Sequence, residues 1–228
     1  MTSFQVAIDG PASAGKSTVA KLVAQKFGFI YCDTGAMYRA VTLAALQQGV
    51  AMDDEAAIIE IAQHLPLRFE AGDPQQVFLG DQNVTQLIRT SEVAANVSAV
   101  AAIGEVRTAM VAMQREIAAT DNIVMDGRDI GTTVLPQAPV KIFMVASAYE
   151  RARRRYEDNK QRGLPTQSIE ALQAAIELRD QKDSTRAVSP LTQAPDAIRL
   201  DTTHLTIEEV VNEISEIIEK NSTNRLKH

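Results

Sequence analysis

Five short apolar runs of the kind that form buried strands recur along the chain. They occupy residues 4–9, 29–33, 122–126, 140–145 and 197–201. Most are followed by segments whose apolar residues recur at helical spacing, at residues 19–27, 36–46, 169–178 and 206–218. Strands that alternate with helices in this way predict an α/β fold with a doubly wound, five-stranded parallel sheet.

Residues 65–90 interrupt this alternation. Leu65, Leu67 and Phe69 alternate with Pro66, Arg68 and Glu70. A short strand is expected at residues 76–79, and a third is expected to begin at Val84. Turn-forming residues separate these runs, which is typical of a small antiparallel β unit. The unit has too little apolar surface for its own core, so we expect one domain over residues 1–228 with 65–90 as an insertion. Farther along, Gly104 is expected to divide residues 91–118 into two helices.

The stretch after the first apolar run fits the pattern G-x-x-x-x-G-K-[ST] of a phosphate-binding P-loop. An ordinary glycine turn is the alternative, but the Lys-Ser pair and the strand and helix on either side favour the P-loop. Backbone N–H groups and the N-terminus of the following helix would bind phosphate oxygens. Lys16 would reach the β- and γ-phosphates, and Ser17 would bind Mg²⁺. The predicted nucleotide-binding residues are Gly10, Pro11, Ala12, Ser13, Ala14, Gly15, Lys16, Ser17 and Thr18.

Polar residues at two other strand ends have more than one interpretation. Asp126 follows an apolar strand and either orients Mg²⁺ through water or caps the next turn. Thr34 and Arg39 follow the second strand, where ligands bind in open α/β sheets. Arg39 suits a phosphate, although a solvated surface charge is the plain alternative.

An arginine cluster at residues 149–158 stands out in an acidic protein. It could contact nucleic acid, form a solvated helix face, or belong to a lid that closes over transferring phosphates. We favour a lid at approximately residues 150–165. Beyond it, Arg179, Asp183 and Arg186 are spaced so that they could share one helix face.

Composition narrows the class of protein. The formal net charge of −6 and the lack of Trp argue against a protein that coats nucleic acid. The single cysteine, Cys32, excludes an intrachain disulfide, so a reducing cytoplasm is the simplest compartment. No apolar run approaches the ~20 residues of a membrane span, and we expect no signal peptide.

Four strings taken together closely resemble those of bacterial cytidylate kinases. They are residues 10–18, 33–39, 126–132 and 186–191. The resemblance covers nearly the whole chain, including the insertion, which in that family extends the monophosphate-binding region. It implies transfer of a phosphoryl group from ATP to CMP or dCMP, with Mg²⁺, by a monomeric enzyme. With the composition above, we expect a cytoplasmic protein that acts on small molecules and has no nucleic-acid or membrane partner.

The resemblance also implies roles for individual residues. Ser98, Arg107 and Asp129 look like the cytosine-reading group; Arg39, Arg128 and Arg179 look like clamps on the acceptor phosphate; Asp183 and Arg186 look like sugar contacts. Thr34 stands where the family often has Ser, and Ser13 where many members have Gly. The acceptor set is Thr34, Arg39, Ser98, Arg107, Arg128, Asp129, Arg179, Asp183 and Arg186. The residues expected to act on the transferring group are Lys16, Arg128, Arg154 and Arg155.

Two other functions stay open at this point. One is another small-acceptor P-loop kinase, such as a UMP/CMP, AMP or shikimate kinase. The other is a non-catalytic nucleotide sensor or RNA-binding module that uses the arginine helix and would bind ATP without turnover.

Overall fold

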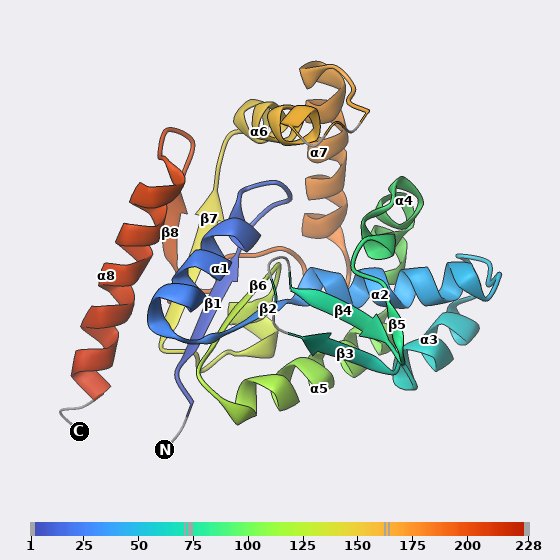
Figure 1. The fold of residues 1–228 in the computed structure, drawn as a ribbon, viewed down its shortest axis with the longest axis horizontal. Helices are drawn as coiled ribbons and strands as arrows, with labels where there is room; N and C mark the ends of the chain where they lie inside the picture. Colours follow the sequence, from blue (N-terminus) through green and yellow to red (C-terminus); the bar gives the residue numbers. More distant parts are fainter. Residues whose placement is uncertain (1–2, 71, 73–74, 162, 164, 226–228) are drawn as a thin grey trace. The chain divides into compact units, whose positions relative to one another are not determined.

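The parallel sheet predicted from the alternating pattern forms the core of the protein. The computed structural model describes residues 3–70, 72, 75–161, 163 and 165–225. The sheet has the order β2-β6-β1-β7-β8 (Figure 1). Its strands are β1 (Gln5–Asp9), β2 (Ile30–Asp33), β6 (Ile123–Gly127), β7 (Val140–Val145) and β8 (Ile198–Asp201). The α/β fold class and all five predicted strands are therefore confirmed.

The strand register determines which residues emerge together at the edge of the sheet. β1 runs parallel to β6 and to β7, with Asp9 opposite Gly127 on one side and opposite Phe143 on the other. The loop that begins at Gly10 and the segment that begins at Arg128 therefore leave the same edge of the sheet, next to each other.

One face of the sheet is covered by α1 (Lys16–Phe27) and α8 (Ile207–Arg225). Their apolar stripes share a core with the strands, for example Val19 and Val23 of α1 and Ile214 of α8, all of which are buried. Thr206 begins α8 as a capping box, since its hydroxyl accepts from the Glu209 N–H while the Glu209 carboxylate accepts from the Thr206 N–H.

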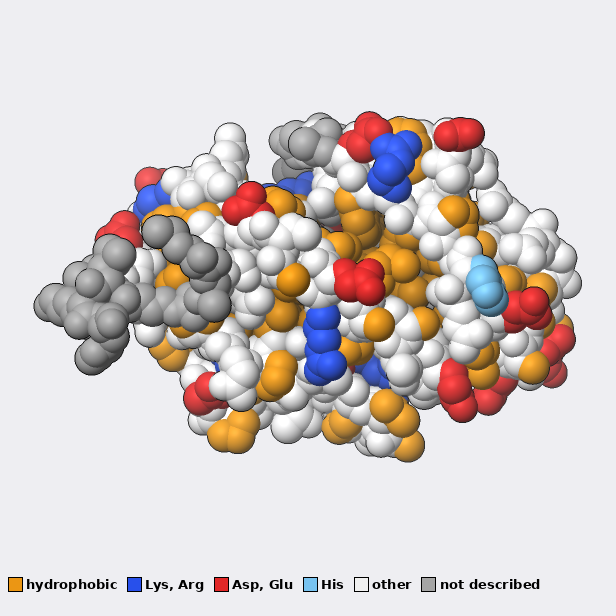
Figure 2. All heavy atoms as spheres, turned by 90° about the horizontal axis from the view of Figure 1, so that it is seen from below, with side chains coloured by type: hydrophobic (Ala, Val, Ile, Leu, Met, Phe, Trp, Pro, Cys, Tyr) orange, Lys and Arg blue, Asp and Glu red, His pale blue; other side chains and the backbone are white. Residues whose placement is uncertain are grey.

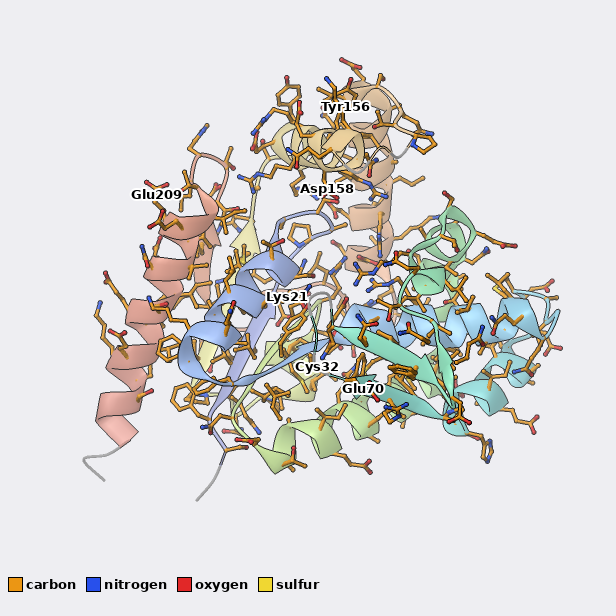
Figure 3. All side chains as sticks on the ribbon, in the orientation of Figure 1. Lys21, Cys32, Glu70, Tyr156, Asp158 and Glu209 are labelled. Carbon is orange, nitrogen blue, oxygen red and sulfur yellow. The ribbon has the colours of Figure 1, made fainter. Side chains whose placement is uncertain are left out.

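Two helices follow β7 and pack against each other. α6 (Ala148–Gln161) and α7 (Ile169–Thr185) meet through buried Ala152, Leu172 and Ile176. Tyr156, labelled on α6 in Figure 3, packs against the same cluster. Residues 162 and 164 of the predicted lid lie outside the described residues.

The chain forms two compact units, residues 1–32 with 117–228 and residues 33–116, and each is described by itself. The second unit contains the predicted antiparallel sheet, in the order β3-β4-β5. Its elements are α2 (Thr34–Gln47), α3 (Glu55–Gln63), β3 (Leu67–Glu70), β4 (Gln76–Leu79), β5 (Gln82–Asn83), a short 3₁₀ helix (Leu87–Arg89), α4 (Ser91–Val100) and α5 (Gly104–Thr120), whose last residues belong to the first unit. The expected break before Gly104 is confirmed, and the single-domain organisation stays a prediction.

The third strand of the small sheet begins two residues earlier than expected. β5 is Gln82–Asn83, and Val84 follows it. The Val84 N–H still donates to the Val77 carbonyl, but the Val77 N–H donates to the Thr85 hydroxyl, so a side chain replaces the backbone ladder at that point.

Candidate active site

The P-loop passes so close to β7 that its first glycine has no space for a side chain. A Cβ atom on Gly10 would lie 2.0 Å from the backbone oxygen of Met144, and Gly10 has a φ of 146°. Gly15, by contrast, has no atom within 4 Å of its Cβ position but a φ of 86°, in the left-handed region that favours glycine. The two glycines of the motif are thus required for different physical reasons.

Ser13 also adopts a left-handed backbone conformation, with a φ of 60°. For a residue with a Cβ this conformation costs roughly 1–2 kcal/mol relative to the right-handed region. Such strain persists only where the surrounding contacts hold the chain in place. The tip of the P-loop is therefore held by neighbouring groups.

The buried side chain of Lys16 folds back onto its own loop, and its Nζ donates to the Pro11 carbonyl at 2.7 Å. Burial lowers the pKa of Lys16 to about 7, and the positive charge of Arg128 and, to a smaller extent, that of Arg179 act in the same direction. Asp126 and Asp9 oppose this shift without cancelling it. The charges of Arg128 and Arg179 therefore act on Lys16 in buried surroundings that already disfavour its own charge.

Ser17 and Asp126 are joined beside the first turn of α1. The Ser17 hydroxyl donates to Asp126 Oδ2 at 2.8 Å, and the Tyr31 hydroxyl donates to Oδ1 at 2.8 Å. Asp126 therefore lies next to the P-loop serine, which fits the first of its two interpretations. The described residues contain no group of three or more His, Cys, Asp or Glu side chains that could hold a metal ion. One hydroxyl and one carboxylate fit Mg²⁺, which uses few protein ligands and takes the rest from phosphates and water.

Asp9 ties the end of β1 to the segment that carries Arg128 and Asp129. Its carboxylate accepts from the N–H groups of Ile130 and Gly131, at 2.8 and 2.7 Å. Burial raises the pKa of Asp9 to about 6, against the lowering effect of these two hydrogen bonds. Sequence reasoning missed this role, although a carboxylate directly before a P-loop on a buried strand was a usable signal.

Two ion pairs link the acceptor residues of the first unit. Arg128 Nε donates to Asp183 Oδ2 of α7 at 2.9 Å. Arg186, which caps the C-terminus of α7, lies 3.6 Å from Asp129 Oδ1, and both side chains are buried. Arg179 lies on the same helix, and its charge acts on Lys16. The structure therefore pairs Arg128 with Asp183 of α7 and Asp129 with Arg186, the residue that follows α7.

The predicted acceptor residues of the second unit begin with Thr34 and Arg39 on α2. Thr34 is buried at the first position of the helix, and Asp33 caps that helix by accepting from the Ala36 N–H. Asp33 also pairs with Arg39 Nη2 at 2.7 Å. Burial opposes ionisation of Asp33, but Arg39, the Ala36 N–H and Arg89 together hold its pKa below the ordinary value.

Arg107 of α5 is buried, and its guanidinium lies over the Tyr38 ring, 5.2 Å from the centroid. Its Nη1 also donates to the Ala101 carbonyl. Ser98 is half-buried on α4, which packs against α2. Thr34, Arg39, Ser98 and Arg107 thus belong to one unit, and the remaining acceptor residues belong to the other.

The arginines of α6 differ in their surroundings. Arg154 pairs with Glu150 and donates to the Thr202 carbonyl, while Arg155 is exposed. Arg151 is buried and donates to the carbonyl oxygen of Ala12 in the P-loop at 2.9 Å. Residue type alone could not single out Arg151 within this cluster, and its position on the buried side of α6 was the missing information.

Comparison with known proteins gives a consistent result. The family model described as cytidylate kinase matches residues 6–220. A cytidylate kinase of Limosilactobacillus reuteri is 69% identical over 218 residues, which cover 95% of this chain and 96% of that protein. One from Lactiplantibacillus plantarum is 58% identical over 225 residues, 98% of each chain. The crystal structure of an uncharacterized protein from Eubacterium ventriosum aligns with a TM-score of 0.52 at 10% identity, over 95% of this chain and 98% of that one, which is a likeness of fold alone.

Proposed function

The chain belongs to the cytidylate kinase family, and on that premise we propose how its residues transfer a phosphoryl group from ATP to CMP and dCMP. The observation that carries the proposal is the buried Lys16 of the P-loop, which donates to the Pro11 carbonyl and whose charged form is disfavoured by burial and by the charges of Arg128 and Arg179. Phosphate groups would reverse that penalty, because an anion among cations favours their charged forms. The site is therefore arranged for a ligand with several negative charges.

Catalysis of phosphoryl transfer rests on positioning and on neutralising charge. In our proposal the P-loop backbone binds the donor phosphates, and Lys16 exchanges its bond to the Pro11 carbonyl for oxygens of the transferring group. Arg128 stabilises the same charge from the acceptor side, held in direction by Asp183. The attacking atom is an already ionised phosphate oxygen of the acceptor, so no general base is assigned.

We propose Mg²⁺ as the cofactor that accompanies ATP. Ser17 would hold it directly and Asp126 through water, and the ion would neutralise charge on the donor phosphates. The hydrogen bond between these two side chains supports the proposal, because it places the hydroxyl and the carboxylate on the same side of the loop.

The acceptor residues keep the roles that family membership suggests. Ser98, Arg107 and Asp129 would read cytosine, with Asp129 accepting from the exocyclic amine. Arg39, Arg128 and Arg179 would hold the acceptor phosphate, and Asp183 and Arg186 would contact the sugar. A site built to hydrogen-bond an amine rejects uracil, because the mismatch leaves buried polar groups unpaired. Arg154 and Arg155 would approach the transferring phosphates in a closed form of the lid.

We propose that the protein acts as a cytoplasmic monomer on small molecules, without nucleic acid or membrane partners. Among the described residues no helix combines the length and apolarity needed to cross a bilayer. On the face drawn in Figure 2, Lys and Arg side chains are scattered among Asp and Glu and form no continuous basic stripe. The net charge of −6 also supports a protein without a nucleic-acid partner, since binding to the nucleic-acid backbone needs clustered cations.

The test is ADP formation from Mg-ATP with CMP, dCMP, UMP, AMP and shikimate as separate acceptors. We expect fast turnover with CMP and dCMP and weak turnover with the others. Asp129→Ala should lose discrimination between CMP and UMP, whereas Asp81→Ala, on an exposed turn, should keep it. Turnover with no acceptor above background would refute the kinase proposal, and retained discrimination in Asp129→Ala would refute the base-reading assignment.

A further inference from the structure

One side chain of α6 and one of α7 hydrogen-bond to the backbone of the same P-loop residue. Arg151 Nη1 donates to the Ala12 carbonyl at 2.9 Å, and Asp180 Oδ1 accepts from the Ala12 N–H at 3.3 Å. The two side chains are also paired with each other, at 2.7 Å between Arg151 Nη1 and Asp180 Oδ2. In Figure 1 the loop between β1 and α1 lies below α6 and beside α7.

These bonds fix the direction of two successive peptide groups. A trans peptide is planar, so its C=O and N–H point in opposite directions and holding one end orients the other. Arg151 holds the C=O of the peptide between Ala12 and Ser13, which turns the Ser13 N–H away from the arginine. The preceding peptide, between Pro11 and Ala12, is held at both ends. Its N–H donates to Asp180 Oδ1, and its carbonyl oxygen accepts from Lys16 Nζ.

These hydrogen bonds lie next to the strained residue of the loop. Ser13, the next residue, has the left-handed φ of 60° that a serine does not adopt without support. Arg151 is itself firmly placed, because its Nε donates to the Ala146 carbonyl at 2.9 Å, directly after β7. Only 7% of the Arg151 side chain and 20% of the Asp180 side chain are exposed, so solvent screens the pair weakly.

We propose that Arg151 and Asp180 are positioning residues that hold the P-loop in its phosphate-binding conformation and so set the affinity for the donor nucleotide. A preorganised loop pays less ordering free energy when a ligand binds. The forked guanidinium is essential to this role, since one side chain must hold the Ala146 carbonyl, the Ala12 carbonyl and the Asp180 carboxylate in a fixed geometry. The inference rests on the proposed function only in that the P-loop binds ATP.

The test compares four variants by direct titration with Mg-ATP in the absence of any acceptor. Arg151→Met should weaken ATP binding by about tenfold, the scale of one lost charge-assisted hydrogen bond. Arg151→Lys should weaken it nearly as much, because an ammonium group cannot replace the fork. Asp180→Asn should lose less, since its amide oxygen can still accept from the Ala12 N–H. Arg153→Met is the matched control on the same helix, since Arg153 is exposed and forms an ion pair with Glu150 of its own helix.

A merely structural role would lower the melting temperature without changing nucleotide affinity. Titrations are therefore made at a temperature where circular dichroism shows each variant folded, and KM values for ATP and CMP are compared with kcat. The proposal predicts a rise in KM for ATP with little change in KM for CMP. Folded Arg151→Met and Asp180→Asn that bind ATP as tightly as the wild type would overturn it, and so would an equal loss in Arg153→Met.

The outcome is independent of the acceptor assignment. If the acceptor panel shows no turnover but ATP binding still depends on Arg151, the proposed function fails and the positioning role stands. If CMP is phosphorylated normally and substitution of Arg151 or Asp180 leaves the ATP affinity unchanged, the positioning role is refuted and the proposed function stands. Should Arg151→Met not fold, Asp180→Asn decides, because it changes one oxygen to an amide nitrogen of similar size.

Discussion

The P-loop and the segment at Asp33 both lie at the carboxyl end of a strand, but the first disfavours the charged form of its lysine and the second favours the charged form of its aspartate. At the P-loop, burial, Arg128 and Arg179 disfavour the protonated form of Lys16. At the end of β2, Arg39 and the Ala36 N–H favour the ionised form of Asp33 in spite of its burial. At the P-loop, the favourable interaction between the cations and an anion forms only when a ligand binds. At Asp33, the favourable interaction between the carboxylate and its partners forms when the protein folds. The charge on Lys16 is disfavoured until an anion binds, whereas Arg39, a proposed ligand of the acceptor phosphate, already has an anionic partner in Asp33.

Lys16→Met should have the largest effect on activity. It removes the cation expected to stabilise the transferring phosphoryl group, so kcat/KM should fall by about a hundredfold to a thousandfold. The free energy of unfolding should not fall, because the lost charge was disfavoured by its surroundings. Steady-state kinetics and urea denaturation measure the two effects, and a marked loss of stability would contradict this view of Lys16.

Gly10→Ala and Gly15→Ala should separate the two reasons for glycine in the loop. The Gly10 variant places Cβ against the Met144 backbone and should lose about 3 kcal/mol of unfolding free energy. The Gly15 variant meets no atom and should lose only the roughly 1–2 kcal/mol of a left-handed alanine. Equal losses in urea denaturation would contradict the steric account of Gly10.

Asp33→Asn should destabilise the second unit and have less effect on ATP binding by the P-loop. It removes one partner of a half-buried ion pair and should lower the free energy of unfolding by about 1–3 kcal/mol at pH 7. Because the pKa of Asp33 is held below the ordinary value of 3.8, this stabilisation is fully present above pH 3.8 and is lost as the pH falls through the lower native value. Denaturation curves of the wild type and the variant should therefore converge only in strong acid, and convergence near pH 6 would refute the pairing.

Ser13→Gly should have the smallest effect. Glycine relieves the left-handed backbone strain but raises the entropy of the unfolded chain by a comparable amount, so stability should change by less than about 1 kcal/mol. A loss beyond that in denaturation experiments would mean that the Ser13 side chain makes a contact that stabilises the loop.

Much of the fold was predictable because it depends on local pattern. The central strands β1, β6 and β7 are nearly continuous buried runs, as a parallel sheet covered on both faces requires. The P-loop was predictable because its backbone geometry demands glycine and lysine at fixed spacing. The small third strand was misplaced because Thr85 satisfies the Val77 N–H with its side chain, a substitution that residue type does not reveal.

The roles of Asp9, Arg151 and Asp180 could not be predicted in the same way. Each acts on backbone atoms of a segment distant in sequence, as Asp9 does on Ile130 and Asp180 on Ala12. Backbone groups carry no sequence signal, so only the fold shows which side chain reaches them. Arg151 was hidden further by the neighbouring arginines of α6.

The most direct test of the contrast between the two regions is proton uptake on ATP binding near pH 8. With its pKa lowered to about 7, Lys16 is mostly neutral at that pH, and phosphates raise its pKa, so binding should take up most of one proton. Calorimetric titration with Mg-ATP in two buffers of different ionisation enthalpy measures the number of protons, with Lys26→Met, an exposed lysine in the last turn of α1, as control. Uptake in the wild type and the control would support a P-loop whose cation is completed by phosphate. Binding without proton uptake would show that Lys16 is already charged, and would contradict the account.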